Sequence, residues 1–281
     1  MRRLFFILLI FWFYSNSIFG EDIPEKKTKV TSGYYIVTYK NTDLNLEISI
    51  NGYKIKDGSS NEDSSGQEDI NYWIMPDKNK LTYRITERKP TKKKSSFPLD
   101  PKAEINLVIG QKGEFPEDGE RLLTFVWSSE EGVKTLGVWQ ELPFDPPFIP
   151  PSKLWTIAKS IEWSTELEKS AIAHLEALTK ALNSKDTKQV LPFLTFREKD
   201  TAEARYYPHD PASDKKALEG LMKTIGPNWK LNKSQIKANL LCDNKIVELT
   251  DSKGHPILKG KKDAAIPIYL SLVDGKWMIV R

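Results

Sequence analysis

Cysteine and histidine are scarce in this chain, and their scarcity removes several kinds of chemistry. The single cysteine, Cys242, cannot form an internal disulfide, and because it follows Leu240 and Leu241 we expect its thiol to be buried. The three histidines lie far apart in the sequence, so no zinc site of recognised spacing can be drawn. Glycine-rich phosphate loops, the GxSxG turn and the HExxH helix are also missing. We therefore expect no metal and no cofactor, and these absences weigh against an enzyme without excluding one.

A marked excess of either charge is missing as well. The sequence has 42 basic and 38 acidic residues, and its formal net charge is +4. Proteins that hold nucleic acid through its phosphates carry a larger and more clustered excess of lysine and arginine. The composition therefore predicts that nucleic acid is not a partner of this chain.

Long apolar runs are missing except at the start, where Leu4 to Tyr14 follow Arg2 and Arg3. This pattern, followed by small residues, is typical of a secretory signal peptide, and we expect residues 1–20 to be one. A bilayer-spanning helix needs about 20 apolar residues, so the run is too short to be one. We expect a periplasmic or secreted protein with no integral membrane segment after cleavage, and with no cysteine near the cleavage point to carry a lipid anchor.

Residues 33–142 consist of short segments of strand character separated by turn residues, without a helical repeat. Residues 34–39 are mostly apolar and aromatic, and residues 44–50 alternate apolar with polar side chains. Asn51-Gly52, directly after the second segment, is a strong hairpin signal. About seven strands at this spacing predict an all-β domain built as a two-sheet sandwich.

Two polar stretches interrupt this domain. Residues 57–69 are rich in glycine, serine and acidic residues, so we expect a mobile loop there. Basic residues predominate between Arg84 and Lys94, and the favoured interpretation is a solvated loop that keeps a sheet edge from pairing. The alternative is a binding patch for an anionic ligand. Its candidate residues are Arg88, Lys92, Lys93 and Lys94.

Five prolines fall within residues 143–151. Such a segment is extended and semi-rigid, so we expect a linker that separates the β-sandwich from a second domain at residues 152–281. Because Phe144, Phe148 and Ile149 alternate with the prolines, we expect the linker to pack along one of the two domains.

The second domain is expected to begin with helices and to end with strands. A capping box starts at Thr165, and apolar residues then recur every three or four positions, as in an amphipathic helix. Asp274-Gly275 predicts a hairpin between the last two strands. The expected elements are helices over 166–182, 186–191 and 213–225, followed by strands over 234–241, 245–250, 265–273 and 276–280.

The helix 166–182 with its exit into Asp186, and the closing hairpin from Ile268 to Val280, resemble the NTF2-like, or cystatin-like, α+β superfamily. The resemblance implies three helices packed across a curved antiparallel sheet, which often encloses a pocket. The strand that the family places between its helices is poorly marked here, and residues 205–207 are its only candidate. Because the superfamily includes enzymes, ligand carriers and assembly modules, the resemblance does not select a function.

A catalytic pocket in the second domain would use His209, Asp210 and Tyr207. Neighbouring histidine and aspartate side chains can form an acid–base pair, and His209-Asp210 is the only adjacent pair in the chain. Pro208 and Pro211 flank the pair, and this pattern favours an exposed structural turn over a catalytic dyad.

Aromatic residues of the β-sandwich are candidates for stacking on sugar rings. Their positions favour core packing for Trp127 and Trp139, whereas Trp73, with Tyr72 beside it, is the best candidate for exposure. An exposed aromatic near a basic and an acidic loop also suits a protein-docking surface.

The leading hypothesis is therefore an exported, non-enzymatic, two-domain protein that binds another protein at the cell envelope, as an assembly factor or an inhibitor. One alternative is a glycan- or peptidoglycan-binding protein that uses Trp73. The other is a small-molecule enzyme or carrier that uses an NTF2-like pocket.

Overall fold

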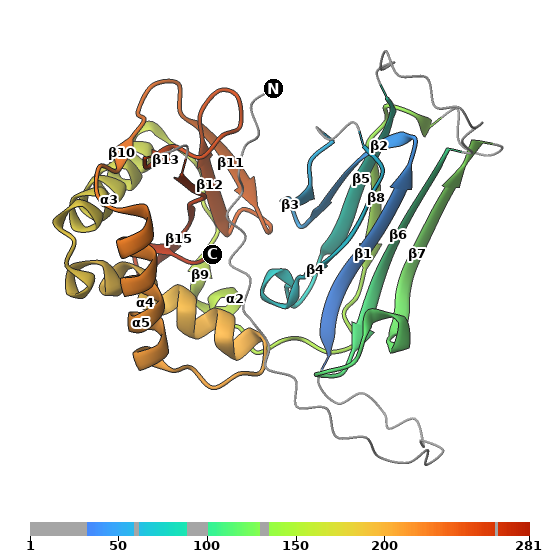
Figure 1. The fold of residues 1–281 in the computed structure, drawn as a ribbon, viewed down its shortest axis with the longest axis horizontal. Helices are drawn as coiled ribbons and strands as arrows, with labels where there is room; N and C mark the ends of the chain where they lie inside the picture. The colour runs from blue at the N-terminus through green and yellow to red at the C-terminus, as the bar shows by residue number, and fades with distance from the viewer. Residues whose placement is uncertain (1–32, 59–61, 89–100, 130–134, 262–263) are drawn as a thin grey trace.

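The computed structural model describes residues 33–58, 62–88, 101–129, 135–261 and 264–281 (Figure 1). The expected signal peptide and the candidate residues Lys92, Lys93 and Lys94 lie outside these ranges. The described chain consists mostly of antiparallel sheets with a few helices, which confirms the mixed α and β class. None of its helices is both long and apolar enough to cross a membrane.

The N-terminal half forms two four-stranded antiparallel sheets that share one core. The first sheet has the order β4 (Ser64–Asp69), β1 (Tyr34–Thr42), β6 (Lys102–Gly110), β7 (Glu120–Ser128). The second has the order β3 (Tyr53–Lys56), β2 (Leu44–Ile50), β5 (Asn79–Glu87), β8 (Gln140–Phe144). Alternation explains the pairing, because the four apolar residues of β2 are buried while the polar residues between them are only partly covered.

The predicted hairpin turn is present, because Asn51 and Gly52 both have positive φ angles and join β2 to β3. The expectation of a loop over residues 57–69 is wrong for its second half. There β4 pairs with β1 from Ile36 opposite Asp69 to Asn41 opposite Ser64. The polar sequence concealed this strand because its stability comes from a neighbour that is distant in the chain.

Three helices begin the C-terminal half: α3 (Thr165–Ser184), α4 (Thr187–Ala204) and α5 (Pro211–Ile225). Each begins after a capping side chain, because Ser164, Asp186 and Asp210 accept hydrogen bonds from backbone N–H groups of the first turn. The cap of α3 is therefore Ser164, one residue before the predicted Thr165.

Helix α4 differs most from the prediction. It was expected to end at Leu191, before Pro192, but it continues through this proline to Ala204. The candidate strand at residues 205–207 is therefore a turn that follows the helix. Val190 and Ala204 of α4 are buried, and packing on both sides of Pro192 offsets the cost of a proline inside the helix.

The C-terminal sheet has the order β11 (Lys237–Leu241), β12 (Ile246–Thr250), β15 (Tyr269–Val273), β16 (Lys276–Ile279), and β9 (Ala158–Lys159) also pairs with β15. A second small sheet contains β10 (Lys230–Leu231), β13 (Leu258–Lys259) and β14 (Ala265–Ile266). The expected strand 265–273 is thus two strands in different sheets, separated at Pro267. Leucines of α3 share a core with residues of β12, β15 and β16.

The proline-rich segment is not a free spacer. Pro143 and Phe144 belong to β8, where proline is tolerated because the strand lies at a sheet edge. Farther along, the Tyr35 hydroxyl donates to the carbonyl of Phe148 at 2.5 Å and accepts from its N–H at 3.1 Å. The segment then leads into the one-turn helix α2 (Leu154–Ile157).

The two halves share one hydrophobic core across their junction. Trp155, Leu241 and Val280 of the C-terminal half belong to the same buried cluster as the facing sides of the two N-terminal sheets. The hairpin turns of the halves also meet, because the Cys242 N–H donates to the Asn51 carbonyl at 2.9 Å. Figure 1 shows β3 and β4 nearest the C-terminal half and β7 farthest from it.

Candidate docking surface

The candidate pocket residues do not form the expected acid–base pair. His209 Nε2 lies 2.7 Å from a carboxylate oxygen of Asp214, one turn into α5, rather than bonding Asp210. Asp210 instead caps this helix through the N–H of Ala212 at 3.0 Å. The ring of Tyr207 faces the ammonium of Lys112 at 3.9 Å. These contacts tie down the start of α5, and a His209–Asp214 pair stands in place of the expected pair of His209 with Asp210.

Trp73 is 1% exposed, so the expectation of an exposed ring is wrong. Trp73 belongs to the short 3-10 helix η1 (Asn71–Trp73). Its ring stacks on that of Tyr53, with 4.1 Å between the ring centroids, and makes an edge contact with that of Tyr269, with 5.2 Å between the centroids. Tyr72 is partly buried next to it, at 5.9 Å between ring centroids. These rings join the two halves, and no face of Trp73 is free to stack on a sugar.

Arg88 is the only one of the four basic candidates within the described residues, and its charge is already compensated. Its guanidinium lies 2.6 Å from the carboxylate of Asp63 and 3.9 Å from that of Asp43. The side chain is only 14% exposed. It therefore holds the loop before β4 against the start of β2 and offers little to an anionic ligand.

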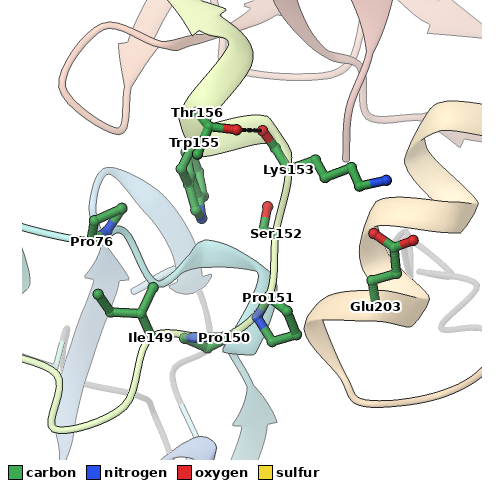
Figure 2. Close-up of a pocket in the computed structure, with 9 residues that line it drawn as sticks. All are labelled: Pro76, Ile149, Pro150, Pro151, Ser152, Lys153, Trp155, Thr156 and Glu203. Atoms are coloured by element: carbon green, nitrogen blue, oxygen red, sulfur yellow. Dashed lines mark hydrogen bonds between the residues drawn. The ribbon is translucent and has the colours of Figure 1, made fainter.

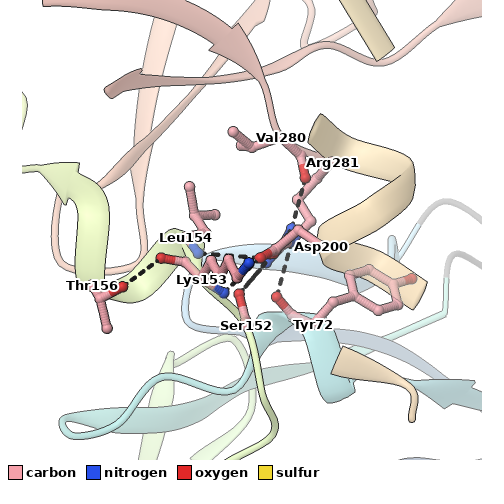
Figure 3. A network of polar contacts seen from close by, with 8 residues as sticks. All are labelled: Tyr72, Ser152, Lys153, Leu154, Thr156, Asp200, Val280 and Arg281. Carbon is pink, nitrogen blue, oxygen red and sulfur yellow. Dashed lines mark hydrogen bonds and ion pairs between the residues drawn. The ribbon is translucent and has the colours of Figure 1, made fainter. Parts of the chain in front are cut away.

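A polar network that sequence reasoning missed lies at the junction of the halves (Figure 3). The buried carboxylate of Asp200 accepts from the hydroxyl of Ser152 and the N–H of Lys153, both at 2.7 Å, and from the N–H of Leu154 at 3.1 Å. Arg281 donates to the same carboxylate at 2.8 Å. Because the side chains of Asp200 and Arg281 are 1% and 2% exposed, this ion pair is closed to solvent and to ligands.

The guanidinium of Arg281 also contacts residues of the N-terminal half. Its Nε donates to the carbonyl of Tyr72 at 2.9 Å, and the rings of Tyr72, Trp73 and Trp155 surround it at 5.4 to 5.9 Å. Burial lowers the pKa of this side chain, whereas Asp200 acts to raise it. The network has a structural role, because it joins α4, the end of β16, the proline-rich segment and η1.

A surface hollow of about 350 Å³ lies beside this network (Figure 2). Its walls are mostly apolar, and the Ser152 hydroxyl that reaches it already bonds Asp200. The residues that line it are Pro76, Ile149, Pro150, Pro151, Ser152, Lys153, Trp155, Thr156 and Glu203. The hollow is open and lacks a convergent set of free polar groups, so it does not define a site for a particular ligand.

The edge strands of the two N-terminal sheets differ in how they are covered. Asp69 of β4 bonds Arg205 of the C-terminal half at 2.6 Å, and Tyr53 of β3 contacts Tyr269. Strand β8 contains Pro143, which has no N–H to offer another strand. Strand β7 pairs with β6 on one side, and no other described strand pairs with its second side.

Exposed apolar side chains accompany this open edge. Val126 of β7 is 57% exposed, and Val138 and Trp139, just before β8, are each 50% exposed. The Trp139 ring faces the guanidinium of Arg84 at 4.8 Å, and Arg84 is held by an ion pair with Glu47. We call the open edge of β7 together with Val126, Val138, Trp139 and Arg84 the distal surface.

The strands that carry the distal surface lie at one end of the paired sheets. The ring of Phe125 in β7 is 4.2 Å from that of Tyr83 in β5. Tyr83 in turn pairs with Gln140, the residue that follows Trp139. Strand β7 and the start of β8 therefore lie at the same end of the paired sheets, with Val126 on the outer face of one sheet and the Trp139 ring on the outer face of the other.

Of the sequence expectations for tryptophan and cysteine, two hold and two, those for Trp73 and Trp139, do not. Trp127 and Cys242 are buried, at 4% and 2% exposure, as expected. Trp139 was expected in the core but is half exposed, because it precedes β8 and its ring lies on Arg84 outside the sheet. A tryptophan two residues after the turn glycine Gly137 was the one local signal that could have indicated this position.

Within the described ranges, no group of three histidine, cysteine, aspartate or glutamate side chains is arranged to hold a metal ion. Comparison with known proteins found no matching family, no matching curated protein and no matching solved structure.

Proposed function

We propose that this chain is an exported, non-enzymatic module that binds another protein at the cell envelope, as an assembly factor or an inhibitor, and that the partner docks on the distal surface. The observation that carries the proposal is the open edge of β7 with Trp139 and Val126 exposed beside it. Apolar side chains gathered next to unpaired backbone groups are typical of sites that other proteins cover.

The chemistry of the distal surface also supports a protein partner. Tryptophan and arginine dominate the binding energy of protein interfaces, and Trp139 and Arg84 already lie in contact. The ion pair with Glu47 holds the guanidinium in place before any partner arrives. Less conformational entropy is then lost on binding, which favours affinity.

We further propose that the chain consists of a β-sandwich domain and an NTF2-like domain. Three helices before an antiparallel sheet agree with the second assignment. In this proposal the NTF2-like domain has no catalytic role. It covers β3 and β4 of the sandwich and leaves β7 on the far side for the partner.

The test is a pull-down from envelope extract with the tagged mature chain and its Trp139→Ala variant. The matched control is Phe115→Ala, which removes another exposed ring, 73% accessible, outside the distal surface. We expect one stoichiometric protein to be retained by the parent chain and by the control. Loss of a central tryptophan costs about 2 kcal/mol or more, so the Trp139→Ala variant should bind at least about tenfold more weakly.

Circular dichroism of both variants checks that they fold. Equal retention by the Trp139→Ala and Phe115→Ala variants would remove Trp139 from the interface. Failure of the parent chain to retain any protein would refute the protein-binding function itself.

A further inference from the structure

Building on the proposed function, we infer that the partner binds by adding an extended strand to the open edge of β7. The edge is suited to this in length. Strand β7 pairs with β6 from Lys102 opposite Ser128 to Ile109 opposite Glu120, so its nine residues keep an extended backbone throughout. An added strand satisfies the backbone groups that β7 does not use toward β6.

The sequence of β7 carries few of the features that protect edge strands. It has neither proline nor lysine, and its two charged residues, Glu120 and Arg121, both lie at its start. The register shift between Leu107 and Val108 bends the pairing near the same end. From Leu123 to Val126 the edge is regular and uncharged, which leaves four residues available to a partner.

The core beneath this edge is incompletely covered. Leu122, Leu123 and Phe125 pack against the shared core but remain partly exposed, whereas the matching residues of β6 are buried. An added strand with apolar residues at alternate positions would cover these side chains. Its other face would lie beside Thr124 and Val126, on the outside of the sheet.

Charge defines one end of the partner strand. Arg121 is exposed and forms no ion pair with any described residue. A carboxylate on the partner strand opposite Arg121 would form an ion pair with its guanidinium. The partner segment is thus extended, apolar at alternate positions, and acidic at one end.

A second copy of this chain fits less well. In an antiparallel pair of β7 strands centred on Thr124, Arg121 of one copy stands opposite Trp127 of the other. No carboxylate of the strand then faces Arg121. The distal surface therefore favours a different protein over self-association.

The test uses nine-residue peptides, so that it does not depend on isolating the partner. The peptide copies Lys102–Gly110, the strand that β7 already accepts, with V108D to place a carboxylate opposite Arg121. A V108K copy is the charge-reversed probe. Binding is measured by fluorescence anisotropy, and its position by hydrogen exchange of residues 120–128.

We expect the V108D peptide to slow exchange in β7 and to bind about fivefold more tightly than the V108K peptide, and Arg121→Gln to abolish this difference. The double variant Thr124→Lys/Val126→Lys should weaken binding at least about tenfold, because lysines oppose edge pairing. Leu240→Lys is the matched control, since Leu240 is an exposed residue on β11, an edge strand of the other half.

Unchanged exchange in β7, or equal peptide binding by the double variant, would overturn strand addition even if the pull-down retains a protein. Peptide binding without any retained protein would uphold the open edge and refute only the proposed function. Dimerisation in light scattering that the double variant abolishes would assign the edge to a second copy and overturn the choice of partner.

Discussion

Asp200 and Arg281 form a buried pair in a network that joins four separate parts of the chain. If Arg281 is replaced by methionine, the Asp200 carboxylate stays buried without its counter-charge. We expect Arg281→Met to lower the free energy of unfolding by about 3–5 kcal/mol, measured by urea denaturation. The control is Lys78→Met, which breaks an exposed ion pair with Asp243 at the same junction.

The control variant should change stability by about 0–1 kcal/mol, because exposed pairs contribute little. The double variant Asp200→Leu/Arg281→Met should lose less stability than Arg281→Met alone, since no unpaired charge remains. Equal small losses for Arg281→Met and Lys78→Met would show that solvent reaches Asp200.

Cys242 reports on the same junction through its reactivity. Burial raises the pKa of its thiol to about 12, although Arg281 acts in the opposite direction. Because only the thiolate attacks disulfide reagents, we expect no reaction with a thiol reagent in the folded protein near pH 8. The reaction should appear along the urea unfolding curve, and fast reaction without urea would indicate that the halves separate readily.

Two tryptophans show where reasoning from single residues failed. Trp73 was expected outside and lies in the core, and Trp139 was expected inside and lies half exposed. Both stand beside turn or proline residues, where alternation along a strand no longer tells which side a residue faces. Their burial depends on Tyr53, Tyr269 and Arg84, which local sequence does not bring together.

At the scale of elements, local signals were reliable where a helix or hairpin is stabilised by its own sequence. The apolar period of α3, the stop of α5 at Gly226 and the Asn51-Gly52 turn were all predicted from such signals. The extension of α4 and the strand β4 were not, because α4 depends on packing around Pro192 and β4 on pairing with β1.

Helices α3 and α4 should lose stability in acid through His174. Its ring packs edge-on against Phe193 at 5.3 Å, its Nε2 has no described partner, and burial lowers its pKa. The unfolded chain takes up this proton more readily than the folded chain. The contribution of His174 is therefore complete above the ordinary pKa of about 6.5 and decreases as the pH falls below it.

Between about pH 7 and pH 5 the parent chain should lose unfolding free energy through His174, by at most about 1.4 kcal/mol per pH unit. We expect His174→Leu to reduce this loss. His255→Leu is the matched control, because His255 is half exposed beside Asp251. Identical pH profiles for the parent and the His174→Leu variant would exclude His174 as the titrating group.

At the scale of the whole molecule, the shared core predicts that both halves unfold together. Tryptophan fluorescence, far-ultraviolet circular dichroism and the reactivity of Cys242 should give coincident urea transitions. Two separated transitions would mean that the junction contributes little to stability.

The contact between the two hairpin turns can be tested with a pair of glycines. Gly52 and Gly113 both have φ near +89°, so alanine strains the backbone at each. A Cβ at Gly52 would lie 2.8 Å from Leu241 Cδ2, whereas nothing lies within 4 Å of one at Gly113. Gly52→Ala should therefore cost about 1 kcal/mol more than Gly113→Ala in urea unfolding, and equal costs would exclude tight packing there.

The sequence by itself determined the mixed class, the order along the chain of strands, then helices, then strands, and the burial of Cys242 and Trp127. It also led to the expectation of export without metal or cofactor chemistry. These rest on composition, periodicity and turn residues, which act over a few positions of the chain. Tertiary structure alone decided that the halves share a core, that Arg281 and Asp200 join them, and that no other described strand pairs with the second side of β7. Each of these depends on which distant segments pair or pack, and that is settled by the free energy of the assembled molecule rather than by local preference.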